Sequence, residues 1–196
     1  MNFSIPSIIT SSPEQTLELG RALGLAARPG DVILLTGELG SGKTQFTKGI
    51  ALALGVDRPI TSPTFNLIYE YQDATGSQIV LRHFDLYRLE REEELDDIDY
   101  FGLLEDAVVS VVEWGDKFPG ALPNDYLLVE FAYIDEFTRL LRYQAAGRSS
   151  ALLLERLRGL PGGVQGGTPG GMPDGMPVAT PGRVLDGLSG GVPDGR

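Results

Sequence analysis

The chain has 196 residues, 42% of them hydrophobic, and carries 27 Asp and Glu against 16 Lys and Arg, for a formal net charge of −11. This length favours one folded domain plus a remainder, and the acidic balance argues against unaided nucleic-acid binding, which needs a basic footprint. The lack of cysteine excludes disulfides, thiolate metal sites and cysteine nucleophiles. The first residues do not resemble a signal peptide, and no apolar run reaches the roughly 18 residues of a membrane helix, so we expect a cytoplasmic protein without a membrane partner.

The predicted elements alternate between helix and strand. Ser12, Pro13 and Gln15 indicate the start of a helix that continues to about residue 27, with Ser12 and Gln15 as a capping box. The run 31–36 is short and continuously apolar, as in a strand buried on both faces. The elements expected after it are a glycine-rich turn, a helix over 43–54, strands over 65–71 and 78–84, short acidic helices over 90–100, a buried strand over 107–112, paired strands over 126–133 and 138–143, and a helix over 149–158.

Buried strands that alternate with helices predict an α/β layered fold, with a mostly parallel central sheet and antiparallel C-terminal strands. The composition then changes, because residues 161–196 contain 12 glycines and 6 prolines among 36 residues. So many helix and strand breakers leave no regular apolar period. We therefore predict a folded domain over 1–158 and a disordered Gly/Pro-rich tail over 159–196, with a partner-binding segment as the alternative for the tail.

One string carries most of the chemical information, because it matches the phosphate-binding-loop pattern G-x-x-x-x-G-K-[ST] in full. Its residues are Gly37, Glu38, Leu39, Gly40, Ser41, Gly42, Lys43 and Thr44. Glycines let backbone N–H groups approach phosphates closely, and the positive end of the next helix favours anions. The lysine can reach the terminal phosphates, and the threonine hydroxyl can bind Mg²⁺. A buried strand before the string and a helix after it predict a P-loop NTPase-like fold.

A P-loop site also needs an acidic residue that holds Mg²⁺ or its water. Glu113 directly follows the apolar run 107–112, and Asp85 follows the strand predicted over 78–84. Both are therefore expected at the carboxyl ends of strands, where open α/β sheets bind ligands. For each residue, a solvated carboxylate or a helix cap is the alternative.

Three further features have two interpretations each. Ser62 and Thr64 stand where switch-like segments approach the γ-phosphate, although a turn that opens a strand would look the same. His83 is interpreted as a structural histidine in preference to a catalytic base. Trp114 can stack on a ligand or fill the core.

Four stretches, taken together and in this order, resemble the TsaE family (also called YjeE), the bacterial P-loop ATPases of tRNA threonylcarbamoyladenosine biosynthesis. They are residues 36–44 (TGELGSGKT), 62–65 (SPTF), 83–89 (HFDLYRL) and 112–114 (VEW), and the similarity extends over about residues 10 to 145. The resemblance implies that Lys43 and Thr44 bind phosphate and magnesium and that Glu113 is associated with the metal. It implies a Walker-B-type or catalytic role for Asp85, a switch-like loop over 62–64, and a position for Thr16 near the nucleotide.

The resemblance further implies a weak, partner-stimulated ATPase that is not itself the threonylcarbamoyl transferase. Its cofactors would be ATP and Mg²⁺, its catalytic residues Lys43, Asp85 and Glu113, and its partners TsaB- and TsaD-like proteins, through which it would reach tRNA indirectly. A P-loop kinase of a small metabolite is the alternative, although the sequence shows no basic lid. A GTP switch would carry an N-K-x-D motif, which does not occur. A nucleotide-binding module without hydrolysis stays open.

The stretch 90–106 holds nine carboxylates and a single basic residue, Arg91. A solvated face is the usual explanation of such a run. The interleaved apolar residues also make it a candidate surface for the partner proteins.

Overall fold

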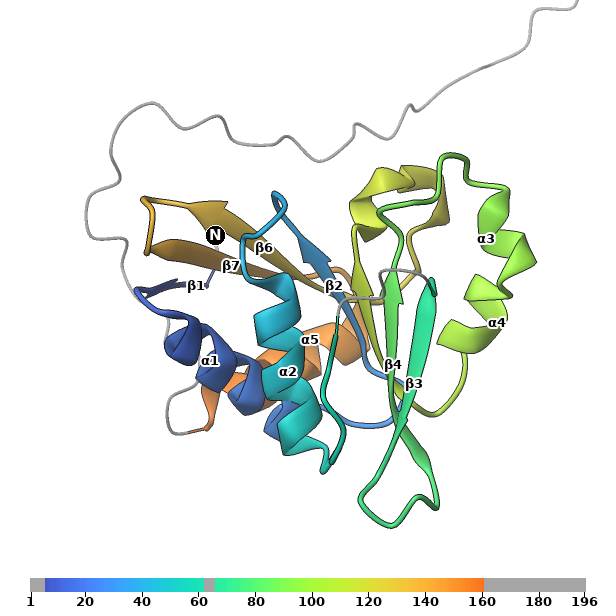
Figure 1. Ribbon diagram of the computed structural model, residues 1–196, viewed down its shortest axis with the longest axis horizontal. Coiled ribbons are helices and arrows are strands. Elements are labelled where there is room, and N and C mark those ends of the chain that lie inside the picture. The colour runs from blue at the N-terminus through green and yellow to red at the C-terminus, as the bar shows by residue number, and fades with distance from the viewer. Residues whose placement is uncertain (1–5, 62–65, 161–196) are drawn as a thin grey trace, which may run out of the picture.

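The computed structural model describes residues 6–61 and 66–160. Within them the strands form one seven-stranded sheet in the order β1-β7-β6-β2-β5-β4-β3 (Figure 1). The elements are β1 (Ser7–Thr10), α1 (Pro13–Ala26), β2 (Val32–Thr36), α2 (Lys43–Ala53), β3 (Ile68–Gln72), β4 (Ile79–Asp85), α3 (Glu94–Asp97), α4 (Tyr100–Leu104), β5 (Val109–Glu113), β6 (Leu127–Tyr133), β7 (Arg139–Ala145) and α5 (Arg148–Arg158). Two short 3₁₀ turns, Gly115–Lys117 and Pro119–Ala121, follow β5.

The centre of the sheet is parallel, which confirms the predicted fold class. Strands β6, β2, β5 and β4 are joined by parallel pairings, and β7 returns antiparallel to β6 as expected. The two edge strands differ from a simple parallel sheet. β3 pairs antiparallel with β4 because the connection over 73–78 is too short for a parallel crossover. β1, which was not predicted, pairs antiparallel with β7.

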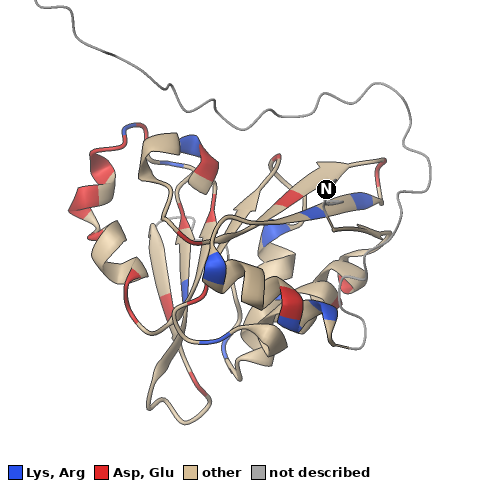
Figure 2. Cartoon of the chain, turned by 180° about the vertical axis from the view of Figure 1, so that it is seen from behind, with Lys and Arg blue, Asp and Glu red and all other residues tan. Residues whose placement is uncertain are grey.

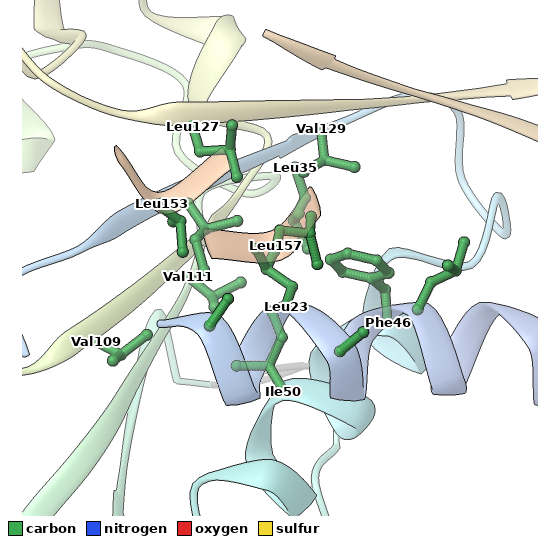
Figure 3. Close-up of a cluster of buried hydrophobic side chains, with 14 of the residues drawn as sticks. Leu23, Leu35, Phe46, Ile50, Val109, Val111, Leu127, Val129, Leu153 and Leu157 are labelled. Carbon is green, nitrogen blue, oxygen red and sulfur yellow. The ribbon is translucent and has the colours of Figure 1, made fainter. Parts of the chain in front are cut away.

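Side chains of β2 alternate between two cores, which explains its continuously apolar sequence. Ile33 and Leu35 belong to the cluster under α1, α2 and α5, whereas Val32 and Leu34 belong to the cluster on the other face, which α3 and α4 cover. Figure 3 shows helix residues of the first cluster directed at strand residues. Those labelled are Leu23, Phe46, Ile50, Leu153 and Leu157 from helices and Leu35, Val109, Val111, Leu127 and Val129 from strands.

Helix α1 begins as predicted, with one difference in the cap. The Ser12 hydroxyl accepts a hydrogen bond from the Gln15 N–H at 3.3 Å. The Gln15 side chain does not return to Ser12, as a capping box requires, but accepts from the N–H of Ser11 at 2.8 Å. The cap therefore includes one more residue than the sequence pattern predicted.

Helices α1 and α2 pack closely because each has a glycine at the crossing. A Cβ on Gly20 would overlap the carbonyl oxygen of Phe46, and one on Gly49 would overlap that of Leu17. The helix that follows the glycine-rich loop is thus held against α1 at backbone contact distance.

Helix α5 ends at Arg158, the last residue of the predicted domain, and Leu160 still packs against the first cluster. The rest of the predicted tail, from residue 161, lies outside the described residues. In the described ranges, no helix combines the length and the apolar character that a membrane span requires.

Replacing Gly20 with Ala should lower the free energy of unfolding by about 1–3 kcal/mol, because the new methyl group must push the two helix backbones apart. Urea denaturation measures the effect. Arg21→Ala is the matched control, since this neighbouring side chain is half exposed and its ion pair with Glu18 lies on the surface. Equal unfolding midpoints for the Gly20 variant and the wild type would contradict the close packing.

Candidate functional site

The loop between β2 and α2 adopts backbone conformations that its glycines allow. Gly37 has a φ of 129° and Gly42 a φ of 107°, both in the region that side chains rarely adopt. A Cβ on Gly37 would also collide with the carbonyl oxygen of Phe131 on β6. The predicted loop residues 37–42 are therefore brought together as a compact turn at the carboxyl end of the parallel sheet, immediately before the first residue of α2.

Lys43 begins α2 and turns its side chain back over this loop. Its Nζ donates hydrogen bonds to the carbonyl oxygens of Gly37 (2.8 Å) and Glu38 (2.9 Å). The same ammonium lies 4.1 Å from the ring centroid of Trp114, a distance at which a cation is attracted to an aromatic face. Burial lowers the pKa of the Lys43 ammonium, and the nearby carboxylates of Glu113 and Asp85 oppose that shift. A positive group is thus held at the mouth of the loop.

Glu113 connects the loop helix with the sheet. It is the last residue of β5 and only 3% exposed. Its Oε1 accepts a hydrogen bond from Thr44 Oγ1 at 3.1 Å and lies 2.9 Å from His83 Nε2. In the parallel register Glu113 pairs with Asp85 on β4. The two predicted acidic residues therefore lie side by side at one edge of the sheet.

A cavity of about 380 Å³ opens at this edge. Its lining combines the groups that the sequence singled out with neighbours from the same turns. The lining residues are Leu39, Gly40, Gly42, Lys43, Thr44, Gln45, Asp85, Tyr87, Arg88, Glu113 and Trp114. One oxygen of Asp85 accepts the N–H of Tyr87 at 3.1 Å, which orients this carboxylate. Ammonium, guanidinium, hydroxyl and carboxylate groups thus converge on one space.

The oxygen atoms of this site suit Mg²⁺ only if a bound ligand, such as a phosphate, supplies further oxygens. Within residues 6–61 and 66–160, no group of three or more His, Cys, Asp and Glu side chains is placed to hold a metal ion by itself. Mg²⁺ is usually bound by one or two protein oxygens and completes its octahedral shell with water and phosphate oxygens. The Thr44 hydroxyl and the Glu113 carboxylate supply such oxygens beside a phosphate-binding loop.

Thr16 lies on the other side of the loop. Its hydroxyl donates to the carbonyl oxygen of Ser12 at 3.2 Å and bonds Thr10 Oγ1 at 3.0 Å. It lines a second cavity, of about 260 Å³, together with loop residues and the β6–β7 turn. The residues of this cavity are Ser12, Pro13, Thr16, Gly40, Ser41, Gly42, Gln45, Glu136, Phe137 and Arg139. Thr16 is therefore next to the loop but outside the cavity of Lys43 and Glu113, and its position near a nucleotide stays a prediction.

The two remaining predicted residues, Ser62 and Thr64, lie outside the described part of the chain. Of the residues with two interpretations, His83 is fully buried and bonded to Glu113, and Trp114 lines the main cavity while packing on Tyr87 at a ring-centroid distance of 5.0 Å. Trp114 has a φ of 63°, which is unusual for a residue other than glycine. Such strained conformations cluster at functional sites.

One contact to the loop was missed by the sequence analysis. The hydroxyl of Tyr133, near the end of β6, donates to the carbonyl oxygen of Leu39 at 3.1 Å, and the guanidinium of Arg139 stacks on the Tyr133 ring at 4.1 Å. In the sequence Tyr133 is only a strand residue, and no local pattern marks it. The contact arises because β6 lies beside β2 in the sheet.

A buried strand, a glycine-rich loop and a helix that starts at a lysine, with two carboxylates at neighbouring strand ends, define a P-loop-type protein. Comparisons identify the family. The family model described as "Threonylcarbamoyl adenosine biosynthesis protein TsaE" matches residues 10–141. The chain therefore belongs to the TsaE family, the proteins named for tRNA threonylcarbamoyladenosine biosynthesis.

Individual relatives agree with this assignment. The chain is 38% identical over 148 residues to the tRNA threonylcarbamoyladenosine biosynthesis protein TsaE of Bacillus subtilis, a match that covers 76% of this chain and 90% of the relative. It is 41% identical over 135 residues to the protein of the same name from Nostoc, covering 67% and 81%. Among solved structures, YdiB of Bacillus subtilis superposes with a TM-score of 0.63 and 30% identity, over 79% of this chain and 95% of YdiB.

Proposed function

We propose that this protein binds ATP with Mg²⁺ in the cavity between Lys43 and Glu113 and hydrolyses it in support of threonylcarbamoyladenosine formation in tRNA. The observation that carries the proposal is the meeting of Thr44 and Glu113, at 3.1 Å, directly beside the phosphate-binding loop. The family assignment supports the pathway. To this pathway assignment we add two points, that the bound nucleotide is ATP and that the protein hydrolyses it.

In this proposal each side chain has a separate task. The loop N–H groups and the start of α2 bind the phosphates, and Lys43 exchanges its two carbonyl partners for phosphate oxygens. Thr44 and Glu113 hold Mg²⁺ directly or through its water, and the metal, when bound, neutralises charge on the phosphates. Asp85, fixed by the Tyr87 N–H, orients water at the same edge. The chain thereby acts as an ATPase and not as the threonylcarbamoyl transferase.

We further propose that TsaB- and TsaD-like proteins are the partners and that tRNA is reached through their complex. The charge of the chain supports this indirect contact. Figure 2 shows acidic residues gathered on α3 and the adjoining loop, in which Arg91 is a basic exception. Such a surface would repel the phosphate backbone of tRNA, whereas it can attract a basic patch of a protein.

An ATPase assay with and without the TsaB- and TsaD-like proteins and unmodified tRNA tests the function as a whole. The proposal predicts slow release of free phosphate by the chain alone and faster release with the partners. Phosphate that appears on a small metabolite in place of free phosphate would support the kinase alternative and contradict the proposal.

Lys43→Ala should remove nucleotide binding at ATP concentrations that saturate the wild type, because a charge that faces the terminal phosphates is lost. Equilibrium dialysis with labelled ATP measures this loss. The melting temperature should stay within a few degrees of the wild type, since the ammonium contacts two loop carbonyls and the face of Trp114 beside the cavity. ATP binding at wild-type affinity by the variant would show that the nucleotide is not bound in this loop.

Glu113→Gln should preserve ATP binding in the absence of metal and lower magnesium-dependent hydrolysis by at least about tenfold. The amide keeps the size of the side chain and removes the negative charge that Mg²⁺ or its water requires. Titration of the hydrolysis rate with Mg²⁺ provides the measurement. Superimposable titrations of variant and wild type would assign Glu113 a structural role only.

Reversing the charges of Glu93, Asp96 and Asp97 to Lys should slow association with the partner proteins several-fold at low salt, because complementary charge mainly raises the association rate. All three residues are exposed. Stopped-flow or biosensor association rates at low and high salt measure the effect, which should fade as salt screens the charges. Glu18, Asp57 and Glu155, reversed together, form the control, since they are also exposed and lie in other parts of the chain. Unchanged association rates for the α3 variant would show that this surface is only a solvated face and does not contact the partners.

A further inference from the structure

Among the buried ionisable side chains that the structure describes at the site, His83 is the one to which the proposed chemistry gives no task. It lies in the middle of β4, with its side chain fully buried. Its Nε2 is 2.9 Å from Glu113 Oε1. Its Nδ1 has no hydrogen-bond partner among the described residues. The imidazole ring does not line the main cavity. In the described part of the chain, the polar contact of this ring is thus directed at Glu113.

The direction of the hydrogen bond follows from the chemistry of the two groups. An ionised carboxylate only accepts hydrogen bonds, so Nε2 carries the hydrogen and donates it. The Thr44 hydroxyl donates to the same oxygen, Oε1, at 3.1 Å and lies 3.4 Å from Oε2. Two donors from different elements, β4 and α2, therefore fix the carboxylate through Oε1. The second oxygen, Oε2, keeps most of its capacity to accept.

The contact sets the orientation of a group that has little other support. Glu113 is 3% exposed, so water contributes little to its solvation, and a buried carboxylate needs donors to remain charged. If Thr44 turns its hydroxyl toward Mg²⁺, the donor that stays with Oε1 is His83. A ligating or metal-associated carboxylate is commonly oriented by such an outer hydrogen bond.

From this geometry we propose that His83 is a positioning residue, which holds the Glu113 carboxylate in the orientation that serves Mg²⁺ beside Thr44. The inference rests on the proposed magnesium-nucleotide function and deepens it. His83 acts through Glu113 and touches neither nucleotide nor metal.

Two substitutions with polar amides separate positioning from simple core packing. The amide nitrogen of Gln is as many bonds from Cβ as Nε2 of His is, whereas that of Asn is one bond shorter and cannot reach Oε1. His83→Gln should therefore retain the donor, and His83→Asn and His83→Leu should lose it. Ser110→Ala is the matched control, because Ser110 is fully buried on the neighbouring strand β5 and its hydroxyl has no partner among the described residues.

The experiment measures ATP binding with and without Mg²⁺, and the fluorescence of Trp114 is the signal that reports binding. This is the single tryptophan of the sequence, and it lines the cavity. In EDTA, all four variants should bind ATP as the wild type does, because the loop and Lys43 are unchanged. The Mg²⁺ concentration that gives half of the full increase in ATP binding should rise about tenfold or more in the Asn and Leu variants, as when other residues that orient a metal ligand are lost. In the Gln and Ser110 variants this Mg²⁺ concentration should stay within about threefold of the wild-type value.

Three outcomes are informative. If the Asn and Leu variants titrate with Mg²⁺ as the wild type does, the positioning role is overturned. If every variant, Gln included, loses affinity equally with and without Mg²⁺, His83 only supports the fold, and the proposal is likewise overturned. If Mg²⁺ does not change ATP binding by the wild type, the proposed magnesium-dependent function is itself contradicted. Should the Leu variant not fold, the comparison of Asn with Gln decides the question alone.

Discussion

A carboxylate that is buried in a protein needs hydrogen-bond donors, and Glu113 receives them from two elements that are distant in sequence. Thr44 on α2 and His83 on β4 both approach its Oε1, at 3.1 and 2.9 Å. The three elements meet because β2, which leads into the loop and α2, pairs with β5, and β5 pairs with β4, all in parallel. The sheet register, the close packing of α1 on α2 and the compact loop all serve to keep these groups at one edge.

Much of this arrangement could be predicted from the sequence. The glycine-rich loop is a local pattern with a strong physical meaning, the strand before Glu113 is recognisable as an apolar run, and the strand before Asp85 is recognisable beside a turn. Both carboxylates were expected at the carboxyl ends of strands, where open α/β sheets bind ligands, and β4 and β5 do end at Asp85 and Glu113. The structure adds that the two residues are direct neighbours in the parallel register of these strands.

Other features depend on contacts that no local pattern encodes. β1 is a short edge strand, whose pairing with β7 is determined by the tertiary fold. The bond from the Tyr133 hydroxyl to the Leu39 carbonyl follows from the order of strands in the sheet. His83 is fully buried, and its contact with Glu113 could not be foreseen, because it requires the exact register of β4 on β5.

In the proposed function, the metal-dependent chemistry depends on the contact between Thr44 and Glu113. The most direct measurement is a crystal structure of the protein with Mg²⁺ and a non-hydrolysable ATP analogue. We expect phosphates within the loop 37–42 and the Lys43 ammonium moved to them from the carbonyl oxygens of Gly37 and Glu38. We expect Mg²⁺ between the phosphates and the side chains of Thr44 and Glu113. A nucleotide bound elsewhere, or a metal ion that leaves the Thr44–Glu113 hydrogen bond intact and lies away from both residues, would contradict the proposed function.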